Sequence, residues 1–375
     1  MSNKKDSIYN IKVEKLFLDQ LNPRLYGESA GESQDVIKEK IYFKESIDEL
    51  ASSLAVNGYF QEEPIIVVPK SESDYDLINE DNFNEFDYIV VEGNRRTTSV
   101  KLLLDANNSI VDSDFPKILS QDIRLNLSEL PSILYRNRDD VDIYLSIRHI
   151  TGNRKWDAFA KAKYIYDKVN KINLSENNTS NSISILSNQI GDKSNVIRKN
   201  YIYYKIFQSI ESDVLDYKTK HIKDRFSLLE VALASGNTSI SNFIGIHNFK
   251  SLDLESDIIQ SNKIDELTDL TVWIFGKDES GDGKLISESR SINQFLKPIL
   301  ENQEATEHLR EYGDVEGAFQ LTDGEERLVI GNVKKANKLI STILGRAKKY
   351  KNNDEFSISL ADLKDTIDSL EKIIS

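Results

Sequence analysis

Residues 88–104 read YIVVEGNRRTTSVKLLL, in which a short apolar run passes through one glycine into a second apolar segment. The run from Tyr88 to Val91 is typical of a buried strand, and the leucines after Val100 indicate a helix. Gly93 permits the tight turn between them, because glycine adopts backbone angles that other residues avoid. The first turn of a helix offers free N–H groups and positive potential, so the arginines and hydroxyls after Gly93 predict a phosphate or oxyanion site.

The elements on either side of this stretch complete a small α+β unit. Apolar positions at helical spacing predict a helix over 46–57, with a capping box formed by Ser46 and Glu49 and an end at Gly58. Alternating or short apolar runs predict three more strands, over 9–20, 64–68 and 133–135. We therefore expect an α+β fold, with a small mixed sheet in residues 1–152.

The chain beyond this unit is predicted to be mostly helical. A helix over 183–190, a turn at Gly191 and a second helix from Ser194 to Phe207 form a helix-turn-helix pattern, for which plain helix packing is the alternative. The start of the second helix would contact DNA. The residues there are Lys193, Ser194, Asn195, Arg198 and Lys199. We expect an all-α helix-turn-helix domain over 153–210 and a mostly helical interaction or oligomerisation domain over 211–375.

Four further segments carry expectations of their own. Polar residues over 173–182 predict a linker, and residues 271–276 predict a strand or another buried segment. Residues 332–351 hold seven bases and no acid, and their apolar positions predict a helix with one buried face and one basic face, which would bind nucleic acid or an acidic neighbour. Leucine and isoleucine recur at alternating spacings of three and four from Leu360 to Ile374, so we expect a homodimer or a partner protein bound through the C-terminal third.

Composition limits the classes of function. The 375 residues carry 48 Lys and Arg against 62 Asp and Glu, and the net charge of −14 argues against coating nucleic acid by bulk charge. The absence of cysteine excludes disulfides, Cys-ligated zinc and thiolate nucleophiles, and the four histidines lie too far apart for a helix-borne zinc site. No apolar run approaches the ~18 residues of a membrane span, and the start of the chain shows no secretory signal, so we expect a cytoplasmic protein with no membrane partner.

Residues 47–70 and 88–103 together resemble the N-terminal domain of the ParB/sulfiredoxin-like superfamily. The resemblance is carried by a helix, a Gly, a Gln near a Pro, a strand and a Gly-x-Arg-Arg element, which here are Gly58, Gln61, Pro64 and Gly93-Asn94-Arg95-Arg96. Upstream, Asn22-Pro23-Arg24 is similar to the family's first box, and the segment from Arg148 to Gly152 occupies the place of its third. With the helix-turn-helix pattern downstream, the resemblance covers roughly 11–207.

The resemblance implies that a nucleoside triphosphate, CTP or ATP, lies against the Gly-x-Arg-Arg element, with Mg²⁺ as a further candidate. The family motif and the chemistry of the helix start together give the candidate nucleotide contacts, which are Arg24, Gln61, Pro64, Gly93, Asn94, Arg95, Arg96, Thr97 and Arg148. Glu92 and His149 are candidate catalytic residues, for metal binding or proton transfer. The alternative for Glu92 is an ion pair with Arg95, and we interpret Trp156 and Tyr164 as core residues.

This chain also departs from the pattern of ParB partition proteins. Asn94 stands where those proteins usually have Glu, and residues 146–149 lack the carboxylate of the third box, which puts Mg²⁺-assisted hydrolysis in doubt. The departures favour an accessory setting, such as a mobile element or anti-phage defence. The leading hypothesis is a nucleotide-responsive DNA-binding protein. The alternatives are an NTPase or DNA nuclease that uses Glu92, Arg95, Arg96 and Arg148, and an interaction module with a vestigial pocket. Sulfiredoxin chemistry is excluded because the chain has no cysteine.

Overall fold

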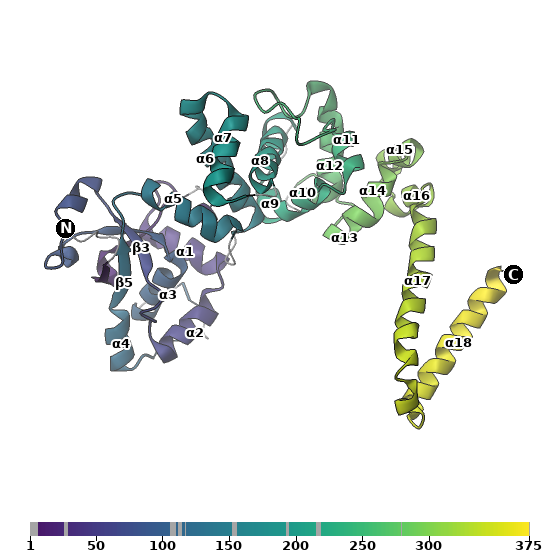
Figure 1. The fold of residues 1–375 in the computed structure, drawn as a ribbon, viewed down its shortest axis with the longest axis horizontal. Coiled ribbons are helices and arrows are strands. Elements are labelled where there is room, and N and C mark those ends of the chain that lie inside the picture. The colour runs from purple at the N-terminus through teal and green to yellow at the C-terminus, as the bar shows by residue number, and fades with distance from the viewer. Residues whose placement is uncertain are drawn as a thin grey trace.

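The computed structural model describes residues 7–25, 29–105, 110–111, 115–116, 118–151, 156–192, 195–214, 219–278 and 280–374. Figure 1 shows a sheet with its helices at the N-terminal end, a helical body in the middle, and a helical hairpin that projects from the body at the C-terminal end. The α+β class predicted from the sequence is confirmed. Within these ranges, every helix is too short or too polar to cross a membrane.

One mixed sheet of five strands lies in the N-terminal part. The strands are β1 (Ile8–Lys12), β2 (Leu16–Leu18), β3 (Ile65–Pro69), β4 (Tyr88–Glu92) and β5 (Glu129–Leu134). They lie in the order β1-β5-β3-β4-β2, with β3 antiparallel to β4 and parallel to β5. The predicted strand over 9–20 is two strands on opposite edges of the sheet, because a 3-10 turn at Val13–Lys15 separates β1 from β2. The strands predicted over 64–68 and 88–91 are confirmed as β3 and β4, and the strand predicted over 133–135 is the end of β5, which begins at Glu129.

Both faces of the central strand β3 are buried. Ile65 and Val67 belong to the N-terminal core, whereas Ile66 and Val68 pack into the core of the helical body. The N-terminal core also includes residues of α1 (Gln34–Lys44), α2 (Ile47–Asn57), α3 (Asn94–Leu104) and α4 (Gln121–Leu127). A strand covered on both sides reads as a continuous apolar run, which is why residues 64–68 show no alternation.

The start and the end of α2 differ in how well the sequence predicts them. Gly58 ends the helix at φ 73°, as predicted. The predicted capping box is wrong, because Ser46 adopts a left-handed conformation at φ 47° and its side chain makes no capping hydrogen bond. The carbonyl of Ser46 instead accepts a hydrogen bond from Arg95 of α3. The turn before α2 is therefore held by a tertiary contact that local sequence does not encode.

The helical body follows β5. Its helices are α5 (Asp139–Ser146), α6 (Ala158–Glu176), α7 (Thr179–Ile190), α8 (Val196–Asp213), α9 (Lys220–Asp224), α10 (Phe226–Ala232), α11 (Thr238–Phe243), α12 (Ile264–Phe275), α13 (Ser289–Ser291), α14 (Lys297–Ile299), α15 (Gln303–Tyr312) and α16 (Val315–Gln320), with π-helical turns at Ile147–Thr151 and Ile292–Leu296. One continuous core links buried residues from Val141 to Phe319. This core extends on both sides of residue 210, where the sequence predicts a domain boundary.

Two sequence expectations for the helical body are wrong. The predicted linker over 173–182 is helical except for a short break, because α6 continues to Glu176 and the side chain of Asn178 caps α7. The predicted strand over 271–276 is the end of α12, although its burial is as expected. Leu267, Leu270 and Ile274 recur at spacings of three and four in that helix, and all three are buried. Helical periodicity therefore outweighs the local strand preference of the segment.

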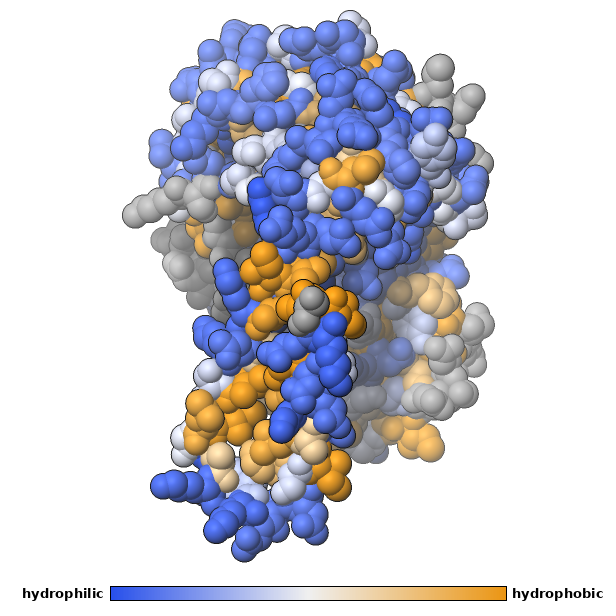
Figure 2. Space-filling view, turned by 90° about the vertical axis from the view of Figure 1, so that its right-hand side faces the viewer, coloured by the Kyte–Doolittle hydropathy of each residue, from blue (hydrophilic) through white to orange (hydrophobic). Residues whose placement is uncertain are grey.

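The C-terminal hairpin differs from the sheet region and the helical body in the exposure of its side chains. It consists of α17 (Gly324–Leu344), a 3-10 turn at Ala347–Tyr350, and α18 (Asp354–Ile374). Neither long helix has a buried residue, so the buried face predicted for 332–351 is wrong. Figure 1 shows the two helices diverging from the turn. Figure 2 shows apolar residues gathered on this projecting part of the surface.

Candidate functional site

A cavity of about 600 Å³ opens between the sheet and the helices of the N-terminal part. Its wall includes Arg24 from the turn after β2, Leu54 from α2, the β4–α3 junction around Gly93, and His149 and Trp156 from the start of the helical body. This volume lies within the roughly 300–1,000 Å³ typical of small-molecule sites. The wall combines apolar side chains with a small number of convergent charged groups, as such sites do.

Gly93 lies on the wall where β3 passes close to the start of α3. It adopts φ 102° at the N-cap of α3, and a Cβ atom added there would lie 2.5 Å from Cγ2 of Ile65. Only glycine fits both the backbone angle and the close approach of β3. No side chain caps α3, and its first main-chain bond runs from the N–H of Thr97 to the carbonyl of Gly93. The N–H groups of the first turn are therefore left for solvent or a ligand.

Arg24 and Arg95 approach the α3 end of the cavity from two elements. Nη1 of Arg24 lies 2.7 Å from Oε2 of Glu45, and Nη2 of Arg95 donates to the carbonyl of Ser46 over 2.7 Å. Nε of Arg95 is buried and has no hydrogen-bond partner among the described residues. Both guanidinium groups can therefore donate hydrogen bonds to a ligand. Arg24 would exchange its carboxylate partner for the ligand, whereas Arg95 would keep its hydrogen bond to Ser46.

Arg96 lies deeper, and a tyrosine and a glutamate hold it. Its Nη1 donates to the hydroxyl of Tyr59 over 3.1 Å and to the carbonyl of Glu63, and lies 3.4 Å from the carboxylate of the same glutamate. Burial raises the pKa of Tyr59 to about 12, so this hydroxyl stays protonated, and it donates to the Glu63 carbonyl over 2.8 Å. Arg96 therefore ties the segment after α2 to the start of α3.

A carboxylate–histidine pair lies on the cavity wall beside Gly93. Nε2 of His149 lies 2.9 Å from Oε2 of Glu92, and Nε of Arg148 lies 3.3 Å from the other carboxylate oxygen. Burial is the largest single influence on the pKa of Glu92 and raises it. The hydrogen bond from His149, with the charges of His149, Arg148 and Arg96, outweighs burial and lowers the pKa below its usual value. The His149 ring is 2% exposed and stacks on Trp156 with a centroid distance of 4.6 Å. Such a pair can hold or move a proton.

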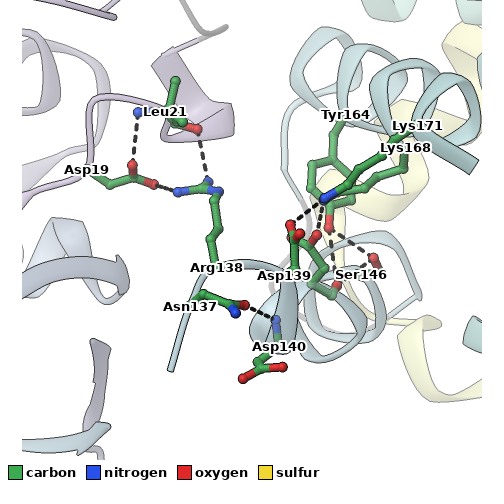
Figure 3. Close-up of polar contacts among 11 residues, drawn as sticks. Asp19, Leu21, Asn137, Arg138, Asp139, Asp140, Ser146, Tyr164, Lys168 and Lys171 are labelled. Carbon is green, nitrogen blue, oxygen red and sulfur yellow. Dashed lines mark hydrogen bonds and ion pairs between the residues drawn. The ribbon is translucent and has the colours of Figure 1, made fainter. Parts of the chain in front are cut away.

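Asn94 has a positioning role at this site. Its side-chain amide donates to the carbonyl of Val90 over 2.7 Å and accepts the N–H of Asp19 over 2.9 Å. The Asp19 carboxylate in turn pairs with Arg138, which also donates to the carbonyl of Leu21 over 3.0 Å (Figure 3). Asn94 and Arg138 therefore fix the turn that carries Arg24 over the end of α3.

The element that carries Arg138 is itself fastened to the helical body. Lys168 and Lys171 of α6 pair with Asp142 and Asp139 of α5, and the hydroxyl of Tyr164 donates to the carbonyl of Asp142 over 3.1 Å (Figure 3). Tyr164 and Trp156 are both buried, as predicted. Through these contacts the helical body supports one wall of the cavity.

The cavity brings together most of the candidate residues, but not all of them. The candidates on its wall are Arg24, Glu92, Gly93, Asn94, Arg95, Arg96 and His149. Arg148 lies behind Glu92, and the predicted alternative pairing of Glu92 with Arg95 is replaced by pairs with His149 and Arg148.

Gln61, Pro64 and Thr97 lie off the cavity wall. Gln61 is exposed and Pro64 half-buried, whereas Tyr59, which is buried, and Glu63, which is exposed, both line the cavity. Thr97 is fully buried within α3, and its hydroxyl has no hydrogen-bond partner among the described residues.

Sequence reasoning missed the wall residues whose side chains hold Arg24 and Arg96, namely Glu45, Tyr59 and Glu63. Tyr59 and Glu63 flank Gln61 in the Gly-to-Pro segment from Gly58 to Pro64. Their position in that segment was the available signal, because a turn directs only some of its side chains toward a neighbouring cavity. Glu45 carried no signal, because its pairing with Arg24 joins segments that only the fold brings together.

The predicted DNA-reading face is largely engaged in packing. Arg198 donates from Nε to the carbonyl of Phe249 and from Nη2 to the carbonyl of Leu252, both over 2.8 Å. Nζ of Lys199 lies 3.1 Å from Oγ of Ser235. Burial lowers the pKa of Arg198, which still carries its charge at neutral pH. Arg198 therefore braces α8 against the segment after α11.

The remaining DNA candidates lie at the start of α8. Asn195 occupies the N-cap position at φ 59° and is exposed, and it makes no side-chain capping bond. Lys193 and Ser194 lie outside the described residues. The helix-turn-helix order itself is present, with Gly191 at φ 71° between α7 and α8. The tyrosines of α8 at 201, 203 and 204 are buried in the core of the helical body.

No group of three or more His, Asp or Glu side chains is arranged to hold a metal ion in the part of the chain that the structure describes. Comparison of the chain with protein-family models, with curated proteins and with solved structures finds no match.

Proposed function

We propose that this chain binds a nucleoside triphosphate, CTP or ATP, in the cavity at the start of α3, and that the nucleotide controls binding to DNA. The observation that carries the proposal is the convergence of Arg24, Arg95 and Arg96 on an uncapped helix N-terminus opened by Gly93. Guanidinium forks and helix N–H groups are complementary to phosphate oxygens. The resemblance of the same residues to the ParB/sulfiredoxin-like pattern supports the same ligand.

The charges of the cavity wall limit how the phosphates bind. Glu45 and Glu63 already pair with Arg24 and Arg96, so a polyphosphate has to replace carboxylate oxygens with its own. Such an exchange costs little when one anion replaces another in a charge-assisted hydrogen bond. Arg95 is the exception, since its partner is a neutral carbonyl. We therefore propose that Arg95 supplies the largest share of phosphate affinity.

Magnesium fits this site only as a companion of the nucleotide. Glu92 is the carboxylate next to Gly93, but His149 and Arg148 engage both of its oxygens. Mg²⁺ binds proteins mainly through one or two carboxylates together with substrate phosphates and waters. Glu92 would hold the ion, and the ion would neutralise phosphate charge. The residues present supply at most one ligand of this kind.

DNA is the second ligand in the proposal. It rests on the helix–Gly turn–helix order of α7 and α8 and on the resemblance to the ParB/sulfiredoxin-like pattern. It does not rest on Arg198, because that side chain is engaged with backbone carbonyls. Asn195 and Lys199 are the described candidates nearest to solvent at this helix start. Binding that depends on nucleotide would support the proposal, and binding through phosphate contacts would weaken steeply with salt.

A second candidate function is nucleotide hydrolysis. It is favoured by the 2.9 Å pair of Glu92 and His149 on the cavity wall, in which the carboxylate orients the imidazole for proton transfer. Glu92→Gln would then abolish turnover of ATP or CTP and leave nucleotide binding in place. Absence of turnover in the native protein would leave the binding proposal alone.

The test is a titration with ATP, CTP, GTP and UTP, with and without Mg²⁺, followed by thermal unfolding. A ligand at about 100 times its Kd stabilises a protein by about 2.7 kcal/mol, which gives a clear shift in melting temperature. We expect the shift to disappear in Arg95→Ala. It should persist in Arg136→Ala, a control arginine that is 41% exposed and pairs with Asp76 away from the cavity. No shift with any nucleotide, or an undiminished shift in Arg95→Ala, would overturn the proposal.

A further inference from the structure

The C-terminal hairpin exposes an unusual share of the large apolar side chains of this chain. Among the described residues, 13 of the 28 exposed large hydrophobic side chains lie between 324 and 374. They include Val333, Leu339 and Ile343 of α17 and Leu360, Ile367 and Leu370 of α18, with exposed fractions from 42% to 67%. Large apolar patches of this kind mark interaction surfaces.

The apolar positions of the two helices follow the same rule. In α17 the residues are Val329, Val333, Ala336, Ile340 and Ile343, and in α18 they are Phe356, Leu360, Leu363, Ile367, Leu370 and Ile374. Each set is spaced alternately by four and three residues, the spacing of helices that pack along a shared seam. Each helix has 21 residues, which is about 31 Å at 1.5 Å per residue. We call these two sets the seams of α17 and α18.

Additional apolar residues widen the stripe on each helix. Ile330, Leu339 and Leu344 lie beside the seam of α17, and Ile373 lies beside the seam of α18; all four are exposed. A single neighbouring helix covers only a narrow seam, whereas a wide stripe is typical of a bundle with two neighbours for each helix. Closure of α17 on α18 within one chain would therefore leave much of the stripe in water.

The charges of the two helices are opposite. Helix α17 holds four bases and two acids, a net charge of +2, and four more bases follow it in the turn, whereas α18 holds six acids and two lysines, a net charge of −4. In a bundle of two hairpins each α17 has an α18 on both sides, one from its own chain and one from the other copy. Opposite charges then flank every contact, and the two basic helices lie on a diagonal.

We propose that α17 and α18 form a four-helix bundle with the same hairpin of a second copy of this chain. A second copy is the occupant that presents the matching seams, equal lengths and opposite charge together, and a two-fold interface requires only that one surface be complementary to itself. This proposal is independent of the nucleotide site, because the hairpin projects away from the sheet (Figure 1).

The first experiment measures the mass of the full chain in solution. We expect light scattering to give twice 42.8 kDa as the concentration rises from about 1 to about 200 µM, a range that covers ordinary dimer affinities. Ile343→Glu and Leu370→Glu, in the two seams, should each hold the mass at 42.8 kDa. The matched control is Ile358→Glu, because Ile358 is 62% exposed on α18 but lies off the seam. Far-UV circular dichroism should show the native helix content in all three variants.

The second experiment tests the pairing of α17 with the partner's α18. A variant with Lys334→Glu and Lys335→Glu makes both helices acidic, and a variant with Asp362→Lys, Asp365→Lys and Asp368→Lys makes both basic. We expect each variant alone to self-associate about tenfold more weakly at low salt, and an equimolar mixture to recover the native mass. A monomeric native chain at the highest concentration would overturn the proposal, as would seam variants that dimerise like Ile358→Glu. A mixture no tighter than its components would overturn the α17–α18 arrangement.

Discussion

The wall of the N-terminal cavity and the C-terminal hairpin differ in how far contacts within one chain stabilise their side chains. Around Gly93, side chains that differ in charge are paired within the chain, and the Glu92–His149 pair is almost fully enclosed. Along α17 and α18 no residue is buried, although the seams are as apolar as the core. The charged groups of the first region find their partners within one chain. The second region leaves its large apolar side chains exposed in a single copy.

This difference predicts whether a substitution in each region changes the free energy of unfolding or the association of two copies. A change at the cavity alters contacts that the chain makes with itself, so it should lower the free energy of unfolding directly. A change in the hairpin removes almost no contact within the chain, so it should act on association with another copy. The following predictions test that contrast, from the largest expected effect to the smallest.

Gly93→Ala should lower the free energy of unfolding by about 3 kcal/mol, measured by urea denaturation. A left-handed conformation costs a residue with a Cβ about 1–2 kcal/mol, and the 2.5 Å approach to Ile65 adds overpacking of about 1–3 kcal/mol. Gly191→Ala is the matched control, because Gly191 has φ 71° but no atom within 4 Å of the added Cβ. Equal losses in the two variants would show that β3 does not press on Gly93.

Arg198→Ala should lower the free energy of unfolding by about 2 kcal/mol, because it leaves the carbonyls of Phe249 and Leu252 without their charged donor. Lys199→Ala, which removes a neighbouring base with a solvent-exposed hydrogen bond, should change it by less than about 0.5 kcal/mol. Urea denaturation of both variants measures the difference. A stable Arg198→Ala protein with lost DNA affinity would instead assign Arg198 to DNA contact.

Glu92→Gln should reduce stability by about 1–2 kcal/mol at pH 7. The pKa of Glu92 in the folded chain lies below its unfolded value of 4.5, so its carboxylate stabilises the fold above that pH. As the pH falls through the folded pKa this contribution is lost. The difference between native protein and variant should therefore shrink below pH 4.5 in denaturation series at several pH values.

The control for this pH series is Glu301→Gln, which changes an exposed carboxylate. It should show the same stability as the native protein at every pH. A Glu92→Gln difference that stays constant between neutral and acid pH would mean that the ionised carboxylate contributes nothing to stability.

Truncation after Gly331 should change the stability of the remaining chain by less than about 0.5 kcal/mol, because the removed residues are exposed. The measurement is denaturation at a protein concentration where the full chain is monomeric, since dimerisation adds stability by mass action. A large loss at that concentration would show that the hairpin packs on the body and is not a separate surface.

The sequence predicts most of the strands and helices of the sheet region, but it does not predict what the apolar face of the hairpin contacts. Strand–Gly–helix order at 88–104 is decided locally, by a glycine turn between a buried run and a helical run, and the structure confirms it. The pairing of Arg24 with Glu45, or of Glu92 with His149, joins residues 21 and 57 positions apart. Such contacts depend on the sheet order, which local periodicity does not specify.

The errors have physical reasons of their own. Periodic apolar residues in 332–351 predict a helix, which the structure has as far as Leu344, where a turn follows. The same pattern cannot say whether the apolar face meets the body, another copy or water. Arg198 has the position of a DNA contact in the motif, yet the chain returns 50 residues later and covers it. The contribution of a charged side chain is decided by what packs beside it.

Hydrogen exchange of backbone amides with and without each nucleotide tests the central claim most directly, because it reports where a ligand binds as well as whether it binds. The account predicts slower exchange at 93–97, where α3 begins, and at 58–63, which carries Tyr59 and Glu63, with ATP or CTP. Arg95→Ala should remove this protection. Unchanged exchange at the start of α3 with every nucleotide, or protection confined to segments away from the cavity, would contradict it.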